Sequence, residues 1–140
     1  MVIEEVAERL HSCAVRLLRR ARVADREATV GPAQLSVLSV LYFSGALPIN
    51  RLAELEQVAQ PTMSRLVTSL MAAGAVTRRA SADDRRVQLV EITPAGRAIF
   101  ELARARRLEI IRAVVAKLDP AALHALMPAL DQLAEAIAQS

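Results

Sequence analysis

Residues 60–74 read Gln-Pro-Thr-Met-Ser-Arg-Leu-Val-Thr-Ser-Leu-Met-Ala-Ala-Gly, and this stretch decides the fold. Its apolar residues recur at steps of three and four, which is the spacing of one face of a helix. They are Met63, Leu66, Val67, Leu70 and Met71. Pro61 suits the first helical position, and Gly74 suits a C-terminal cap. The pattern therefore predicts a helix from Gln60 that packs on a core through one face.

The other face of this predicted helix is polar and free of acidic residues. Its outward positions are Gln60, Thr62, Ser64, Arg65, Thr68 and Ser69. No Asp or Glu occurs from Gln57 to Ala82, whereas a helix that needs only solubility usually pairs acidic with basic residues. Arginine can fork onto guanine, glutamine onto adenine, and hydroxyls onto phosphates or bases. We expect this face to read the major groove of DNA; the alternative is a plain polar surface.

Two short extended runs follow, at residues 76–79 and 87–92, and a polar segment joins them. This arrangement predicts a β-hairpin with a charged tip. Arg85 and Arg86 at the tip are long cations that suit a minor groove or its flanking phosphates. Asp84 can hydrogen-bond Arg86 or the turn backbone and so fix the direction of the loop. The alternative is an ordinary solvated turn.

Helices are predicted on both sides of these elements. Apolar periodicity places them at residues 2–26, 31–45, 49–58, 94–118 and from 120 onward, with Pro128 expected to kink the last one. The predicted fold is mainly α with a small β-hairpin wing, which is a winged helix-turn-helix flanked by dimerisation helices. We assign residues 1–30 to an N-terminal dimerisation helix, 31–93 to the DNA-binding unit and 94–140 to C-terminal dimerisation helices, all within one compact domain.

The first and last helices carry apolar stripes that one small unit cannot cover. Burying them against a second copy is the economical solution, and twofold symmetry is its usual form. We therefore expect a homodimer. The predicted interface residues are Ile3, Val6, Leu10, Leu123, Leu126, Leu130, Leu133 and Ile137.

The composition agrees with a small helical protein that binds nucleic acid. The chain has 140 residues, of which 54% are apolar but only 2% aromatic, so its core must be built from Leu, Val, Ile, Ala and Met. This composition suits packed helices, because Ala and Leu favour helix whereas aromatic residues favour strand. The net charge is +3, and all but one of the 18 basic residues are arginine, Lys117 being the exception. The planar guanidinium suits phosphates and guanine edges.

Cysteine and histidine are too sparse for several classes of site. Cys13 is the only cysteine, which excludes an internal disulfide framework and fits a reducing compartment. With His11 and His124 far apart, no spacing suits a metal, and we expect neither metal nor cofactor. No leader pattern and no apolar run of about 20 residues occurs, so we expect a cytoplasmic protein without a membrane partner.

Three function classes compete for this sequence. A DNA-binding regulator explains the acid-free helix, the arginine-tipped hairpin and the dimer stripes together. A winged-helix module for protein–protein contact explains the fold and the stripes but gives no reason for the acid-free surface. An enzyme needs a nucleophile with a base and an orienting group, and no histidine or carboxylate pair accompanies the hydroxyls. We therefore predict a non-enzymatic regulator that binds double-stranded DNA.

Four segments in order resemble the MarR family of regulators. The run Gly31-Pro32-Ala33-Gln34-Leu35-Ser36-Val37-Leu38 resembles its second helix. The run from Leu66 to Val76 resembles its recognition helix and following strand, and Asp84-Arg85-Arg86 matches its wing motif. Thr93-Pro94-Ala95-Gly96-Arg97 matches the start of its fifth helix. The resemblance spans essentially the whole chain and is strongest from Gly31 to Arg97.

This resemblance implies a triangular dimer whose recognition helices enter successive major grooves of a palindromic operator, with repression as its effect. By position it assigns Gln60, Pro61, Thr62, Ser64, Arg65 and Ser69 to bases and phosphates. It makes Arg86 the wing-tip residue with Asp84 as orienting partner. It makes Arg51, Arg78 and Arg79 contacts to the DNA backbone. This chain departs from the family at Ala59, at Pro61 and at Glu56-Gln57, where an apolar residue and glycine are usual.

The resemblance also implies regulation by a small aromatic or phenolic effector. Tyr42, Phe43 and His11 are the candidate residues for such a ligand, but packing in the core is the favoured interpretation for the two aromatic residues and a surface position for the histidine. One branch of the family senses oxidants through a cysteine in its first helix. Cys13 is the candidate for that role, whereas its place in the apolar stripe with Leu10 and Leu17 favours inert packing.

Overall fold

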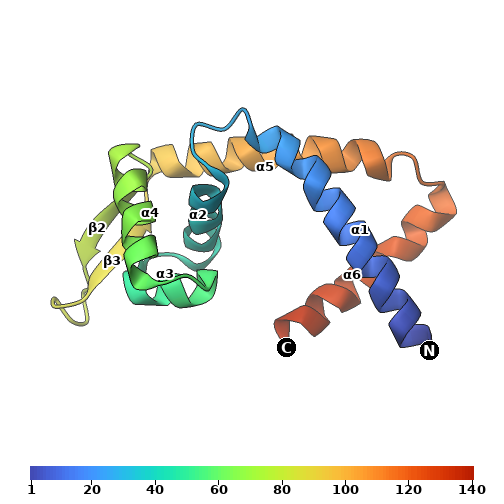
Figure 1. Cartoon of the computed structure of the whole chain (residues 1–140), viewed down its shortest axis with the longest axis horizontal. Coiled ribbons are helices and arrows are strands. Elements are labelled where there is room, and N and C mark those ends of the chain that lie inside the picture. Colours follow the sequence, from blue (N-terminus) through green and yellow to red (C-terminus); the bar gives the residue numbers. More distant parts are fainter. The chain divides into compact units, whose positions relative to one another are not determined.

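The computed structural model describes residues 1–140 and is mainly helical with one small sheet. Its elements are α1 (Val2–Asp25), α2 (Pro32–Ser44), β1 (Leu47–Pro48), α3 (Ile49–Glu56), α4 (Gln60–Ala72), β2 (Val76–Ala80), β3 (Gln88–Ile92), α5 (Pro94–Val115) and α6 (Pro120–Ala138) (Figure 1). The predicted fold class is confirmed. Strand β1 was not predicted, because two residues are too short to show an alternating pattern.

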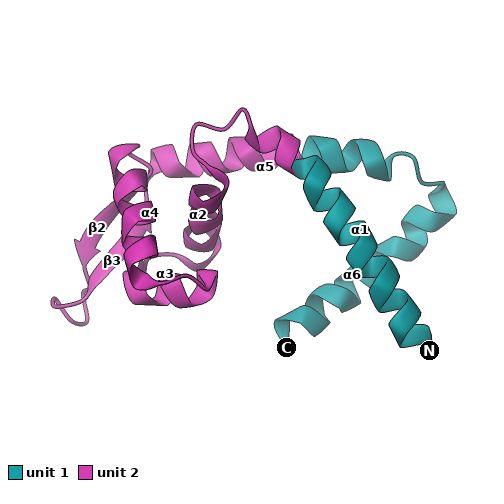
Figure 2. Cartoon of the chain, viewed as in Figure 1, with its two compact units in different colours: residues 1–21, 108–140 teal, residues 22–107 magenta.

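The chain divides into two compact units, which Figure 2 draws in different colours. Residues 22–107 form one unit, which contains α2, α3, α4, the sheet and the first part of α5. Residues 1–21 and 108–140 form the other, which contains most of α1, the end of α5 and all of α6.

The core of the 22–107 unit lies between α2, α3, α4 and the sheet. Met63, Val67 and Leu70 of α4 are fully buried, as the apolar spacing predicted, while Met71 remains 40% exposed. Against them α2, α3 and β3 contribute fully buried side chains, among them Leu38, Leu41, Leu52 and Val90. The buried face of α4 leaves its polar face outward.

The ends of the helices follow from their sequence. Gly31 is the N-cap of α2, and the Gln34 side chain accepts a hydrogen bond from the Gly31 amide at 2.7 Å. Asp119 caps α6 by accepting from the Ala122 amide at 2.8 Å. Helix α6 continues through Pro128. The turn between α3 and α4 uses Gln57 in a left-handed conformation with φ 55°, where glycine would carry no steric penalty.

The sheet has the antiparallel order β1-β3-β2, and β2 and β3 form the wing (Figure 1). Their register pairs Val76 with Ile92 and Ala80 with Gln88. In the connecting loop the Ser81 amide donates to the Val87 carbonyl at 2.9 Å. The predicted hairpin of β2 and β3 is therefore present. The sheet has one strand more than expected, because β1 pairs with the other edge of β3.

Thr93 and Gly96 fix the start of α5 against the end of α4. The Thr93 hydroxyl donates to the Gly74 carbonyl at 2.6 Å and accepts from the Gly96 amide at 3.0 Å. The Thr93 amide donates to the Ala75 carbonyl at 3.0 Å. Gly96 packs directly on this segment, because a Cβ at its position would lie 2.0 Å from the Ala75 oxygen. The end of α4, the sheet and the start of α5 are thus joined at one point.

Candidate nucleic-acid interface

Helix α4 presents its predicted DNA-reading residues outward. Gln60, Pro61, Thr62, Arg65 and Ser69 are exposed and Ser64 is half-buried. The helix has no acidic residue in its first turn, and Ala59 at its N-cap contributes no side-chain hydrogen bond. The positive end of the helix dipole and its first amides are therefore unshielded by protein groups, which suits a phosphate.

The arginine of this helix is available for a ligand, whereas two of its hydroxyls are engaged. Arg65 forms no ion pair, and its only hydrogen bond is a long one, 3.4 Å from Nε to the Pro61 carbonyl. Thr68 donates back to the Ser64 carbonyl at 2.9 Å. Ser69 accepts a hydrogen bond of 2.5 Å from the Gln34 amide group of α2. A group that contacts α4 from 35 residues away gives no local signal in the sequence.

The wing places its arginines at an exposed tip. Asp84 accepts from both the backbone amide of Arg86, at 3.0 Å, and its side-chain Nε, at 3.2 Å. These hydrogen bonds hold the pKa of the Asp84 carboxyl below its ordinary value. The orienting contact predicted from the sequence is therefore present. Arg85 is exposed beside it and forms no ion pair.

The three arginines assigned to the DNA backbone differ in their surroundings. Arg51 pairs with Glu54 at 3.0 Å, and Arg79 pairs with Glu91 of the neighbouring strand at 2.8 Å. Arg78 is exposed and forms no ion pair. Glu91 lies outside the acid-free segment 57–82, and only the strand register brings it beside Arg79. Two of the three cations are thus partly neutralised within the protein.

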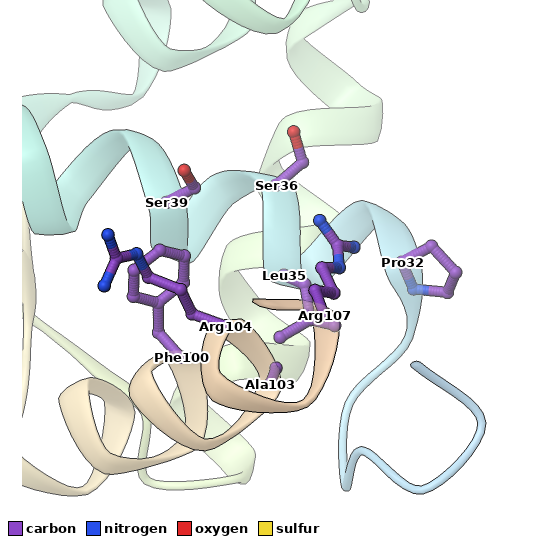
Figure 3. A pocket seen from close by; sticks show the side chains of 8 residues that line it. All are labelled: Pro32, Leu35, Ser36, Ser39, Phe100, Ala103, Arg104 and Arg107. Atoms are coloured by element: carbon purple, nitrogen blue, oxygen red, sulfur yellow. The ribbon is translucent and has the colours of Figure 1, made fainter. Parts of the chain in front are cut away.

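A cavity of about 310 Å³ lies between α2 and α5 in the 22–107 unit (Figure 3). Its lining residues are Pro32, Leu35, Ser36, Ser39, Phe100, Ala103, Arg104 and Arg107. Arg107 makes a two-point ion pair with Asp25, at 2.7 and 2.6 Å, and the Asp25 hydrogen bonds raise the pKa of Arg107. Arg104 forms no ion pair, so the cavity combines an aromatic ring, two hydroxyls and one free cation.

The predicted ligand residues lie outside this lining. Tyr42 and Phe43 pack on Phe100, with ring centroids 4.6 and 5.8 Å from it, and Phe100 itself lines the cavity. The Tyr42 hydroxyl donates to Glu101 at 2.9 Å, which raises the pKa of Tyr42. Phe43 is 69% exposed, contrary to the packing expected of it. His11 is exposed on α1.

The other unit exposes apolar side chains along two helices. No residue of α6 is buried. Of the predicted interface residues, Ile3, Val6, Leu10, Leu130 and Ile137 are exposed, and Leu123, Leu126 and Leu133 are half-buried. Cys13 is exposed rather than packed within the chain. It borders a cavity of about 370 Å³ together with Arg16, Leu17, Arg20, Val114 and Lys117.

The described features define a winged helix-turn-helix protein: a helix with an outward acid-free face, a preceding helix and turn, and a two-stranded wing with an arginine tip. No helix is both long and apolar enough to span a membrane, and no cluster of potential metal ligands is present.

The chain belongs to the MarR family. The MarR family model matches residues 31–87. The chain is 34% identical to the HTH-type transcriptional regulator ML2140 of Mycobacterium leprae over 104 residues, covering 74% of this chain and 73% of that protein. It is 30% identical to the regulator MT0903.1 of Mycobacterium tuberculosis over 135 residues, covering 96% and 94%. The protein is therefore a transcriptional regulator with a DNA-binding helix-turn-helix fold, and the prediction that it is not an enzyme is confirmed by this membership.

Solved structures agree on the whole fold. The transcriptional regulator Tm0710 of Thermotoga maritima matches with a TM-score of 0.81 at 26% identity, covering 97% of this chain and 96% of that one. A MarR family protein of Bacillus stearothermophilus matches with a TM-score of 0.84 at 21% identity, covering 98% and 96%. The resemblance inferred from four short motifs is confirmed.

Proposed function

We propose that the protein is a homodimeric repressor that binds a palindromic operator in the cytoplasm. The recognition helices α4 enter successive major grooves, and the wings reach the flanking minor grooves. The observation that carries this proposal is the outward face of α4, where Arg65 has no acidic partner. A mutant of MepR from S. aureus, whose fold is similar, has been solved bound to an oligodeoxyribonucleotide.

The exposed helices of the 1–21/108–140 unit support the dimer. An α-helix with an apolar stripe and no buried residue is stable in water only if another surface covers that stripe. A second copy offers the same stripe under a twofold axis. Two wings and two recognition helices then read an inverted repeat.

We propose further that an aromatic carboxylate bound in the cavity between α2 and α5 releases the DNA. Phe100 offers a ring for stacking, and the free guanidinium of Arg104 offers a two-point partner for a carboxylate. BpsR of Bordetella bronchiseptica, whose fold is similar, is described as regulated in DNA binding by 6-hydroxynicotinic acid. That compound is an aromatic carboxylate of the size that this cavity can hold.

Replacing Arg65 tests the proposed reading of bases. We expect Arg65→Ala to weaken binding to a duplex selected from a random library by about 1–3 kcal/mol and to relax sequence choice at the contacted position. Binding is measured by fluorescence anisotropy at several salt concentrations. Arg26→Ala removes another exposed arginine, far from α4 in sequence, and serves as the control. Equal binding of all duplexes by wild type and Arg65→Ala would exclude base recognition by this residue.

Replacing Asp84 tests the wing, because the two possible effects of its carboxylate, repulsion of DNA and orientation of Arg86, predict opposite changes in DNA affinity. Removal of an acid beside DNA alone strengthens binding. If Asp84 instead orients Arg86, Asp84→Ala weakens binding about two- to fivefold, and Arg86→Ala does the same with loss of protection at the flanks of the footprint.

Asp83→Ala is the matched control, since Asp83 forms no ion pair with an arginine. The lowered pKa of Asp84 keeps its carboxylate ionised at neutral and mildly acidic pH. The orienting contact therefore contributes above the ordinary pKa of an aspartate and is lost only as the pH falls through the lowered value. Tighter binding by Asp84→Ala would contradict the orienting role.

A further inference from the structure

Ser36 belongs both to the cavity and to the support of the helix-turn-helix. It lies on the exposed side of α2 and lines the cavity with Ser39, and the two side chains point the same way from the helix (Figure 3). Its hydroxyl donates a hydrogen bond of 2.7 Å to Oε2 of Glu56. Ser39 makes no such bond to α3 or α4. One cavity hydroxyl is thus engaged by the DNA-binding element and the other is not.

Glu56 lies where it can affect the position of α4, the proposed recognition helix. It is the last residue of α3, and the left-handed Gln57 follows it directly. Helix α4 begins four residues later, at Gln60. Because the connection is short, we expect the position of the end of α3 to affect the position of the start of α4. This glutamate is also one of the two turn positions at which the chain departs from the usual family pattern.

A second side chain ties α2 to the other half of the recognition helix. Gln34 accepts from the Gly31 amide at 2.7 Å and donates to Ser69 of α4 at 2.5 Å. The first turns of α2 therefore hold both helices that present residues to DNA, α3 through Ser36 and α4 through Gln34. Of these two residues, only Ser36 lines the cavity.

We propose that Ser36 and Glu56 are positioning residues for DNA binding, and that a carboxylate in the cavity weakens DNA binding by taking the hydrogen bond of Ser36. A serine hydroxyl has one hydrogen to donate, so Glu56 and a carboxylate that reaches Ser36 from within the cavity compete for it. Loss of this bond removes the side-chain link between α2 and the end of α3 and leaves the Glu56 carboxylate without its partner. The competition with an occupant, though not the positioning role, rests on the effector cavity proposed above.

The positioning role is tested without any ligand. We expect Ser36→Ala and Glu56→Ala each to weaken binding to the selected duplex about three- to tenfold, which is the contribution of one hydrogen bond. The double variant is expected to be no weaker than either single one, because both remove the same bond. Ser36→Thr and Glu56→Gln keep a donor and an acceptor and retain most of the affinity. Ser39→Ala is the matched control.

Two measurements separate positioning from a general loss of structure. Ser36 is exposed and Glu56 half-buried, so thermal unfolding should change little. The ratio of the affinity for the selected duplex to that for a random duplex should fall. A destabilised protein would instead lose affinity for both duplexes by the same factor. Additive losses in the double variant, or tighter DNA binding by Glu56→Ala, would overturn the positioning role; the second result would make Glu56 a mere source of repulsion.

Benzoate, the smallest aromatic carboxylate, probes the competition. Calorimetry is expected to show benzoate binding by wild type and Ser36→Ala but not by Arg104→Ala. Benzoate should weaken DNA binding by wild type severalfold and by Ser36→Ala hardly at all, and DNA should weaken benzoate binding by the same factor. Equal weakening in both proteins overturns the competition at Ser36 and leaves the effector cavity intact. Absence of benzoate binding to wild type overturns the effector cavity and with it the competition, while the ligand-free variants still decide the positioning role.

Discussion

Gly96→Ala is expected to cost about 3 kcal/mol or more of folding free energy, a large part of the stability of a small domain. The added methyl would lie 2.0 Å from the Ala75 carbonyl oxygen and 2.9 Å from the Ile92 side chain. The backbone oxygen cannot turn aside, because it accepts the hydrogen bond from the Thr93 amide. The start of α5 must therefore move, and the Thr93 contacts break with it. Urea unfolding followed by circular dichroism measures the loss.

Gly31→Ala is the comparison for this substitution. Its Cβ would meet only the Gln34 Oε1 atom at 3.6 Å, an ordinary contact, and its φ of −73° suits any residue. We expect a cost of at most about 1 kcal/mol, from the poorer N-cap. If Gly96→Ala unfolds at the same urea concentration as Gly31→Ala, α5 is not seated tightly on the end of α4.

Leu130→Glu is expected to abolish the dimer and, with it, tight DNA binding. Leu130 is 50% exposed on a helix that has no buried residue. In a twofold dimer each substitution acts twice, and two carboxylates would enter an apolar interface without partners, at a cost of several kcal/mol. Sedimentation should show monomers, and affinity for an inverted repeat should fall at least a hundredfold because each half-site then binds alone.

Leu102→Glu provides the control, because Leu102 is equally exposed, at 54%, but lies in the 22–107 unit. We expect it to sediment as the wild type does. A Leu130→Glu protein that remains dimeric at micromolar concentration would remove α6 from the proposed interface.

Local sequence patterns were sufficient to predict most of the fold. The spacing of Met63, Val67 and Leu70 predicted both α4 and its buried side, and Gly31-Pro32 marked the start of α2 correctly. Strand β1 was not predicted, because its two residues form a strand only by pairing with Val90 and Leu89 of β3, which lie far away in the sequence. Aromatic residues were expected to be buried, but Phe43 lies at the end of α2 beyond the core.

The candidate site was less accessible to sequence reasoning, because its details depend on distant contacts. The exposure of Arg65 and the Asp84–Arg86 contact involve neighbours in the chain, and both could be anticipated. The engagement of Ser69 by Gln34 and of Arg79 by Glu91 arises only when separate elements pack. The same holds for the cavity, which takes its lining from residues of α2 and α5 that are more than 60 positions apart in the sequence.

The alanine at the N-cap of α4 has a consequence for the free protein. Pro61 has no amide hydrogen, and the Met63 amide already bonds to Ala59, so the amides of Gln60 and Thr62 have no acceptor in the helix. In the free protein these amides donate to water, and in the proposed complex a phosphate can accept from them. This end of the helix should therefore fray in solution and exchange its amide hydrogens quickly, and part of the free energy of association is spent on ordering it.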